Sequence, residues 1–275
     1  MATTSPEQTA PVAPAIILVE PQLGENIGFV ARAMLNCGLT ELRLVAPRQG
    51  WPNEKARKVC AGADSVLDGA SVFASARDAV GDLSYVLATT ARPRDTAQDI
   101  LDGGEAAGRL VATGMMGVRS GILFGREATG LVNDDLVLAD ALIEIPLNPD
   151  FASLNLAQAV LIVAYEWFQA SRQGGGRSRH PDGRRDGAGP QPRQLARKAD
   201  FEAMLAHLET ELDACGFLRV PEMRPVTVRN IRTMLTRAGM SDAEVRTFRG
   251  IIAGLARLGR ARVEDDVPPA REDEK

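Results

Sequence analysis

The sequence is poor in the two residues that most often hold metals or act as nucleophile partners. It has three cysteines, Cys37, Cys60 and Cys215, which lie far apart with no Cys-x-x-Cys spacing. Neither a disulfide framework nor a cysteine zinc site is therefore expected. The two histidines, His180 and His207, have no metal-ligand cluster or serine elbow near them in the sequence. Serine–histidine hydrolysis and histidine-based zinc catalysis are not expected either, and we predict no bound metal.

Long apolar runs are also missing. No stretch approaches the ~18 consecutive apolar residues that a membrane helix needs. Residues 1–14 have no basic segment followed by an apolar one, as a secretion signal would. We expect a protein that neither crosses a membrane nor is secreted, and the unpaired cysteines favour the reducing cytoplasm.

Charge is unevenly distributed along the 275 residues, although the net charge is only −4. Residues 1–170 carry 12 Lys/Arg and 20 Asp/Glu, whereas residues 171–262 carry 18 and 10. The last 13 residues carry 2 and 6. A basic segment joined to an acidic body is typical of a protein that docks on phosphates with one region and handles a small molecule with another. Two solvated helix faces would explain the same counts.

Short apolar runs bounded by Gly, Pro, Asp or Asn alternate with segments of helical length in the first 170 residues. This alternation predicts an α/β domain with a mainly parallel sheet and helices on both faces. A closing helix is expected from near Leu154, because apolar residues recur there every three or four positions. The expected strands are Ile16–Glu20, Leu42–Val45, Tyr85–Ala88, Ile122–Phe124 and Leu142–Ile145.

The remainder of the chain predicts a small helical appendage. Apolar repeats indicate one helix over 201–215, ended by Gly216, and a second over 228–235. A third over 245–255 begins with Ser241 as N-cap. The expected organisation is a disordered arm 1–14, an α/β domain 15–172, a flexible basic linker 173–193, a helical extension 194–262 that binds RNA or contributes to a dimer, and a disordered acidic tail 263–275.

The first motif follows the first expected strand and runs from Leu23 to Arg32. Gly24 and Gly28 permit close backbone approach, and a helix N-terminus offers unpaired N–H groups to an anion such as an RNA phosphate. Arg32 lies two turns into this helix, where it can clamp a phosphate or simply cover the surface. The run is not Gly-x-Gly-x-x-Gly, and Pro47-Arg48 stands where a dinucleotide-binding fold has its ribose-binding acid.

The second and third motifs also follow expected strands. Gly125 to Leu131 places Glu127 between two glycines, where it can accept hydrogen bonds or serve as a helix-entry residue. Ile145 to Asn155 contains two prolines, so this loop is stiff. Ser153 is expected as the helix N-cap, and Asn155, inside the first turn, is expected to present its amide to a ligand.

Taken in this order, the three motifs resemble the signature motifs of the SpoU/TrmH branch of the SPOUT RNA 2′-O-methyltransferases, and most closely its TrmJ-type tRNA methyltransferases. Arg126 matches the TrmJ-type pattern, whereas many relatives have Asn before the Glu. The resemblance covers Ile16 to about Arg172 and, more loosely, the helical extension. It implies a C-terminal trefoil knot, a homodimer, S-adenosyl-L-methionine as methyl donor, and 2′-O-methylation of tRNA at the pyrimidine that opens the anticodon loop.

The same resemblance assigns roles to individual residues. It makes Arg32 the catalytic residue, supported by Asn26, Glu127, Ser153 and Asn155. It places the cofactor against Thr89, Ala91, Gly125, Glu127, Gly130, Ile145, Pro146, Ser153 and Leu154, and tRNA against Arg92, Arg94, Arg229 and Arg232.

Other functions stay open from sequence alone. The enzyme could methylate another tRNA position or rRNA. A nicotinamide-dependent oxidoreductase would share the α/β layout but lacks its fingerprint here. A non-catalytic RNA-binding module would explain the basic extension but would not need the three loops.

Overall fold

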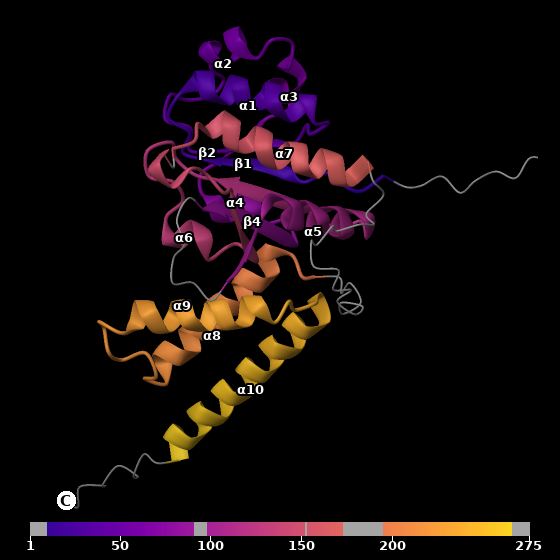
Figure 1. Cartoon of the computed structure of the whole chain (residues 1–275). Helices are drawn as coiled ribbons and strands as arrows, with labels where there is room; N and C mark the ends of the chain where they lie inside the picture. Colours follow the sequence, from indigo (N-terminus) through magenta and orange to yellow (C-terminus); the bar gives the residue numbers. More distant parts are fainter. Residues whose placement is uncertain (1–9, 91–97, 152, 173–194, 266–275) are drawn as a thin grey trace, which may run out of the picture. The chain divides into compact units, whose positions relative to one another are not determined.

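The chain forms two units, Met1–Ala199 and Asp200–Lys275, which are described separately (Figure 1). The structure is a computed structural model, and it describes residues 10–90, 98–151, 153–172 and 195–265. The expected linker, residues 1–9 of the expected arm and residues 266–275 of the expected tail lie outside these ranges. Residues 263–265, expected to be disordered, continue the last helix instead.

The first unit is built on a seven-stranded, all-parallel sheet with the strand order β3-β2-β1-β6-β4-β7-β5. The α/β class and the five expected strands are confirmed. Two edge strands were missed, because each has only three residues and is largely exposed, so neither forms an apolar run. The strands are β1 Ala15–Val19, β2 Leu42–Val45, β3 Ser71–Phe73, β4 Tyr85–Thr90, β5 Asp99–Leu101, β6 Ser120–Phe124 and β7 Ala141–Glu144.

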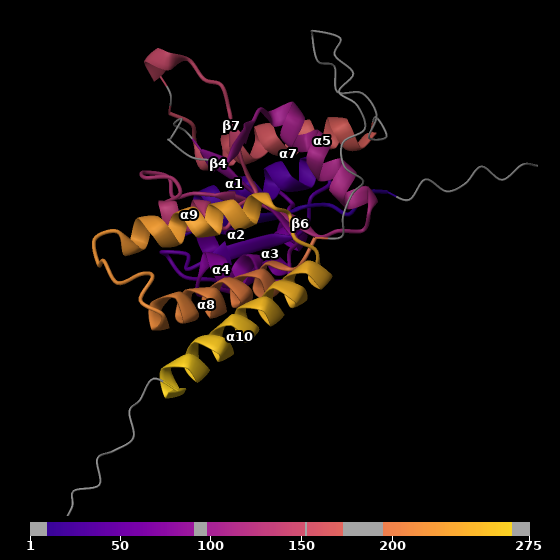
Figure 2. The same cartoon turned by 90° about the horizontal axis from the view of Figure 1, so that it is seen from below.

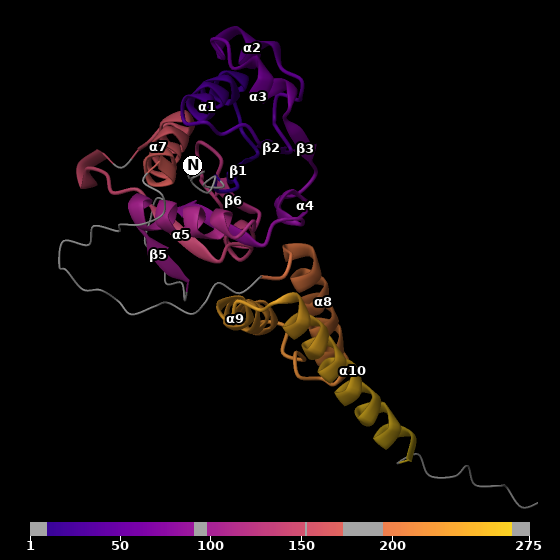
Figure 3. The same cartoon turned by 90° about the vertical axis from the view of Figure 1, so that its right-hand side faces the viewer.

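Helices cover both faces of this sheet (Figure 3). One apolar core takes Ile16 and Leu18 of β1, and the other takes Ala15, Ile17 and Val19, as expected for side chains that alternate across a strand. The first core includes residues of α1 Gly24–Asn36, α2 Glu54–Val59, α3 Asp64–Asp68, α5 Gly103–Met115 and α7 Leu156–Arg172, and the second includes α4 Ala76–Val80 and α6 Asn133–Leu136.

The strand order brings the sequence motifs to one edge of the sheet. β1, β6, β4 and β7 are consecutive neighbours, and all four run in the same direction. The first motif follows β1, the second follows β6 and the third follows β7. Since the carboxyl ends of parallel strands share an edge, the loops that carry these motifs converge there.

The two glycines at the start of α1 serve helix packing. A Cβ atom added at Gly24 would lie 2.3 Å from Asn53 Oδ1, and one at Gly28 would lie 2.2 Å from the carbonyl oxygen of Ala56. Both neighbours belong to α2 or its N-cap. The close approach that these glycines were expected to permit is therefore present, and it is the packing of α1 against α2.

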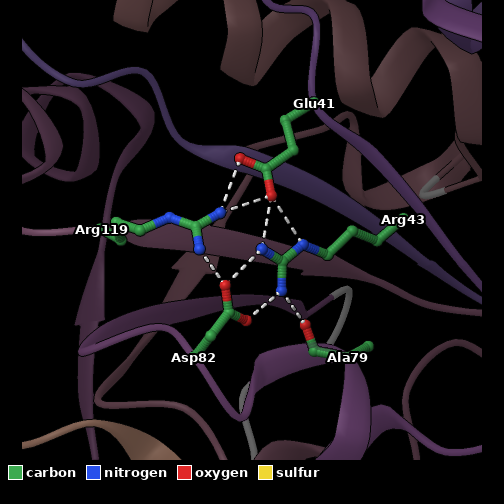
Figure 4. A network of polar contacts seen from close by, with 5 residues as sticks. All are labelled: Glu41, Arg43, Ala79, Asp82 and Arg119. Carbon is green, nitrogen blue, oxygen red and sulfur yellow. Dashed lines mark hydrogen bonds and ion pairs between the residues drawn. The ribbon is translucent and has the colours of Figure 1, made fainter. Parts of the chain in front are cut away.

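At the amino edge of the sheet, four charged side chains form a closed network (Figure 4). Arg43 of β2 is buried and donates to the carboxylates of Glu41 and Asp82 and, at 2.6 Å, to the carbonyl oxygen of Ala79. Arg119 bridges the same two carboxylates from the solvent side. Hydrogen bonding to Arg43 lowers the pKa of Asp82. The network joins β2, β4 and β6 at the edge opposite the sequence motifs.

Helix α7 packs with one face and exposes the other. Val160, Val163 and Trp167 face the core, whereas Leu161 and Tyr165 are 43% and 51% exposed. The apolar stripe expected on this helix followed the wrong side, because several apolar sets here recur every three or four residues. Only Ala164 of that stripe is buried; its members are Leu154, Ala157, Leu161, Ala164, Tyr165 and Phe168. The exposed set is available for a partner.

The second unit consists of α8 Lys198–Ala214, which starts two residues before the unit boundary, α9 Arg224–Arg237 and α10 Asp242–Asp265 (Figure 2). All three expected helices are present. Gly216 ends α8 with a left-handed φ of 76°, and Ser241 and Glu244 exchange the hydrogen bonds of a capping box at the start of α10.

Candidate active site

A single carboxylate connects the first two motifs. Glu127 accepts hydrogen bonds from the backbone N–H of Gln22, at 3.1 and 2.9 Å, and of Leu23, at 3.3 Å. It also accepts one from Asn26 Nδ2 at 2.9 Å. Glu127 lies in the loop after β6, and its donors lie in the segment from β1 into α1. A negative charge at the N-terminus of α1 is favoured by the helix dipole as well as by these bonds.

This carboxylate changes the interpretation of the first motif. The donors of Gln22 and Leu23, just before α1, are taken by Glu127, and the N–H of Gly24 bonds to Gln49 Oε1 at 3.3 Å. Three N–H groups at this terminus are therefore occupied within the protein and are not offered to an RNA phosphate, contrary to the sequence-based expectation for them. The anion bound at this helix terminus is the protein's own side chain.

The third motif is connected to the first by the side-chain amide of Asn155. Asn155 Nδ2 donates to Asn26 Oδ1 at 3.1 Å, and Asn26 is itself buried. Asn155 Oδ1 accepts from the N–H of Ala157 at 2.8 Å, and α7 begins at Leu156. Asn155 is therefore the helix cap, a role that we had expected of Ser153, two residues too early. Asn155 caps α7 and also connects the third motif to the first, because one side-chain amide offers both an acceptor and donors.

A cleft of about 630 Å³ lies beside this network. Among the residues that the sequence assigned to a cofactor, Pro146 does not line the cleft and Ala91 lies outside the described residues. The assigned residues that do line it are Thr89, Gly125, Glu127, Gly130, Ile145, Ser153 and Leu154.

Apolar side chains that the sequence analysis missed complete the walls of this cleft. Phe124 ends β6, and Leu131, Leu136, Leu147 and Leu156 come from the loops and helices that follow β6 and β7. Their positions after strand ends were a usable signal, but leucines there are indistinguishable in sequence from core residues.

Arg32 opens onto a second cleft of about 380 Å³ between α1 and α7. Its lining includes Phe29, Arg32, Asn155, Gln158 and Leu161. Arg32 is exposed and forms no hydrogen bond or ion pair with any described residue. Ser153, Leu154 and Leu156 line the larger cleft, and Asn155 lines the Arg32 cleft. The two clefts therefore adjoin along this segment.

Arg126 is half-buried at the start of the loop that carries Glu127. Its guanidinium pairs with Glu20 at the end of β1 and with Asp135 of α6, the latter at 2.9 Å. Sequence reasoning noted Arg126 as a pattern match but gave it no role.

The arginines that the sequence assigned to RNA differ in environment. Arg229 on α9 is exposed. Arg232, on the same helix, is 9% exposed and forms an ion pair with Glu202 of α8, so its charge holds two helices together. Arg92 and Arg94 fall outside the described residues.

The described residues contain no group of three or more His, Cys, Asp or Glu side chains arranged to hold a metal ion. In the same part of the chain, no helix has the length and apolar character needed to span a membrane.

Comparison with known proteins assigns the chain to a family. Residues 13–165 match the model of the SpoU rRNA methylase family, and residues 199–265 match that of the C-terminal domain of the tRNA methyltransferase TrmJ. The chain therefore belongs to the SpoU family of RNA methyltransferases.

Individual relatives are similar over nearly the whole chain. A tRNA (cytidine/uridine-2′-O-)-methyltransferase TrmJ from Klebsiella pneumoniae is 34% identical over 90% of this chain and 98% of its own. The crystal structure of TrmJ from Z. mobilis ZM4 superposes with a TM-score of 0.76 at 43% identity, covering 89% of this chain and 99% of that one. A probable methylase family protein from Haemophilus influenzae superposes with a TM-score of 0.55 at 28% identity, covering 90% of this chain and 97% of its own.

The Glu127 network predicts a measurable role for its charge. Glu127→Gln removes the negative charge and places an NH₂ group against backbone donors, so we expect methyl transfer to tRNA to fall about 10- to 100-fold, the equivalent of losing roughly 1.5–3 kcal/mol of charge-assisted hydrogen bonding. Glu54→Gln, an exposed carboxylate on α2, is the matched control and is expected to retain activity. Equal rates for both variants would show that the network does not support the site.

Proposed function

We propose that this protein transfers a methyl group from S-adenosyl-L-methionine to the 2′-hydroxyl of a tRNA ribose. The observation that carries the proposal is the convergence of three distant motifs, through Glu127, Asn26 and Asn155, beside one large cleft. The similarity to TrmJ proteins over both units supports tRNA as the substrate.

The larger cleft suits this cofactor. Its volume of about 630 Å³ falls within the range of small-molecule sites. Phe124, Leu131 and Ile145 offer apolar surface for a purine, and Ser153 offers a hydroxyl group for the polar parts. The hydroxyl of Thr89 donates to the carbonyl oxygen of Leu123, which leaves its oxygen as an acceptor. When bound, the cofactor supplies an electrophilic sulfonium methyl group, so the protein's tasks are alignment and help with loss of the hydroxyl proton.

We assign Arg32 to the ribose and its neighbouring phosphate. A guanidinium is a bidentate donor that fixes phosphate or hydroxyl oxygens in direction, and this one is not engaged by any other described side chain. Asn155 lies in the wall of the same cleft and is held by Asn26. Asn26 therefore fixes one residue of the wall against which the ribose would rest.

For the target nucleotide, we propose the pyrimidine that opens the anticodon loop, by analogy with the TrmJ-type resemblance. Methylation elsewhere in tRNA or in rRNA is the alternative. Mass spectrometry of ribonuclease fragments of tRNA and rRNA from a deletion strain separates them, because fragments keep the position of each methyl group. Loss of a 2′-O-methyl group elsewhere, with the anticodon-loop group retained, would contradict the assignment.

We also propose the trefoil knot of this family for the segment from Ile145 into α7. In its support, Ile145, Leu147 and Leu154 line the same cleft as the whole loop from Gly125 to Leu131, so the two segments lie against each other. An experimental trace in which this segment passes outside the earlier loop would contradict the knot.

A homodimer through α1 and α7 is the third part of the proposal. Phe29, Leu161 and Tyr165 are each more than 40% exposed, and Phe29 and Leu161 line the Arg32 cleft. Exposed apolar side chains on adjacent helices are typical of an interface. A second copy seated there would enclose Arg32 and complete the ribose site.

Arg32→Ala is expected to lower methyl transfer at least 100-fold, because it removes the charged group proposed to orient the ribose and its phosphate. Affinity for S-adenosylmethionine, measured by calorimetry, should stay within about threefold, since Arg32 does not line the larger cleft. Normal turnover by this variant would remove Arg32 from the mechanism.

Arg229→Ala is expected to weaken tRNA binding and to reduce by about 1 the slope of log Kd against log salt, as for loss of one phosphate contact. Arg119→Ala is the charge-matched control. It removes an exposed arginine at the amino edge of the sheet and should leave that slope unchanged. Identical slopes for both variants would move recognition away from α9.

Leu161→Glu is expected to convert a dimer to a monomer, because it buries a charge in the proposed interface. Analytical ultracentrifugation measures the change, and activity should fall with dimer content. A wild-type protein that sediments as a monomer at micromolar concentration would contradict the dimer.

A further inference from the structure

Two consecutive side chains of opposite charge fasten the cleft loop to the same upstream segment. Glu127 binds the backbone of Gln22 and Leu23 together with the side chain of Asn26. Arg126, one residue earlier, donates through Nη2 to the carboxylate of Glu20. The loop is thus held at two points, a few residues apart, on the chain that runs from β1 into α1.

Arg126 also closes the loop on itself. Its Nη1 donates to Asp135 Oδ2 at 2.9 Å and, more weakly, to the carbonyl oxygen of Gly130 at 3.4 Å. The N–H of Gly130 returns a hydrogen bond to the carbonyl of Arg126 at 2.8 Å. Asp135 accepts in addition from the N–H of Val132 at 3.1 Å, at the entry to α6. One guanidinium therefore joins the start of the loop, its end, α6 and β1.

The backbone of this loop leaves little room for another arrangement. A Cβ atom at Gly125 would lie 2.3 Å from backbone atoms of Gly130 and Leu131, and Gly130 has a left-handed φ of 68°. The side chains of Arg126 and Asp135 are 12% and 11% exposed, so the pair is largely shielded from solvent. Hydrogen bonding to Arg126 lowers the pKa of Glu20, in keeping with an ionised partner. A buried, hydrogen-bonded charge is costly to leave unpaired, which makes this arrangement rigid.

We infer that Arg126 is a positioning residue for the methyl donor: through Glu20 and Asp135 it holds residues 125–131 as the preformed wall of the large cleft. The inference rests on the proposed function, in that the cleft is taken to bind S-adenosylmethionine. Arg126 acts through the loop backbone, and its effect is therefore on cofactor affinity more than on the chemical step. Lysine cannot replace it fully, because a single ammonium lacks the planar fork that reaches two carboxylates and a carbonyl at once.

The test compares two variants that each remove a largely shielded arginine bridging two carboxylates. Arg126→Met is expected to raise the Kd for S-adenosylmethionine, measured by calorimetry on the full chain, at least tenfold. With saturating cofactor its kcat should fall less than about threefold, and the KM for tRNA should not change. Arg43→Met is the matched control, because it breaks the network at the amino edge of the sheet (Figure 4) and should lower the midpoint of thermal unfolding without altering this Kd.

Two further variants separate positioning from general stability. Arg126→Lys retains one ion pair and should give an intermediate Kd in a folded protein. Glu20→Gln should raise the Kd in the wild-type background and have little added effect in Arg126→Met, since both remove the same contact.

The outcomes are distinguishable. If the Kd of Arg126→Met for S-adenosylmethionine equals that of the wild type, the positioning role is overturned and the proposed function stays intact. The same holds if the Kd of Arg43→Met rises as much as that of Arg126→Met. Failure of the wild-type protein to bind S-adenosylmethionine removes the cofactor assignment, and the positioning role with it.

Discussion

The carboxylate of Glu127 is the interaction on which the rest of the site depends. It reaches from the loop after β6 to the segment that leads into α1, where it meets two backbone N–H groups and Asn26. Charge-assisted bonds of this kind are stronger than neutral ones, and the positive end of the helix dipole adds to them. Because Asn26 then holds Asn155 at the start of α7, one charge fixes three separate motifs relative to one another.

The two edges of the sheet use charge for different purposes. At the amino edge, Arg43 and Arg119 are both satisfied by Glu41 and Asp82, so that network is closed and stabilises the fold (Figure 4). At the carboxyl edge, Arg32 forms no bond with any other described residue. An arginine left unpaired beside a cleft is available to a ligand, whereas one enclosed by carboxylates is not.

Arginines that lie close together in the sequence can have unrelated roles. Arg229 and Arg232 lie on one helix and were assigned together to RNA, yet Arg232 is buried against Glu202 while Arg229 faces solvent. They are three residues apart, close to one helical turn, and a small rotation around the axis separates the packed face from the exposed one. Composition counts both as basic, but only Arg229 contributes to an accessible positive surface.

The sequence by itself determined the α/β class, five of the seven strands, the three C-terminal helices and the location of the motifs at strand ends. These follow from local periodicity and from turn and capping residues, which act over a few positions. It did not reveal the short edge strands, which bury too little to leave an apolar pattern. Only the tertiary structure decided that Gly28 packs against Ala56, that Asn155 rather than Ser153 caps α7, and that Glu127 occupies the donors before α1. The Gly28 and Glu127 contacts join parts of the chain that are distant in sequence, and no local pattern encodes which partner arrives. The cap at Asn155 is a local hydrogen bond to Ala157, but the side chain that makes it is also held by Asn26, 129 residues away.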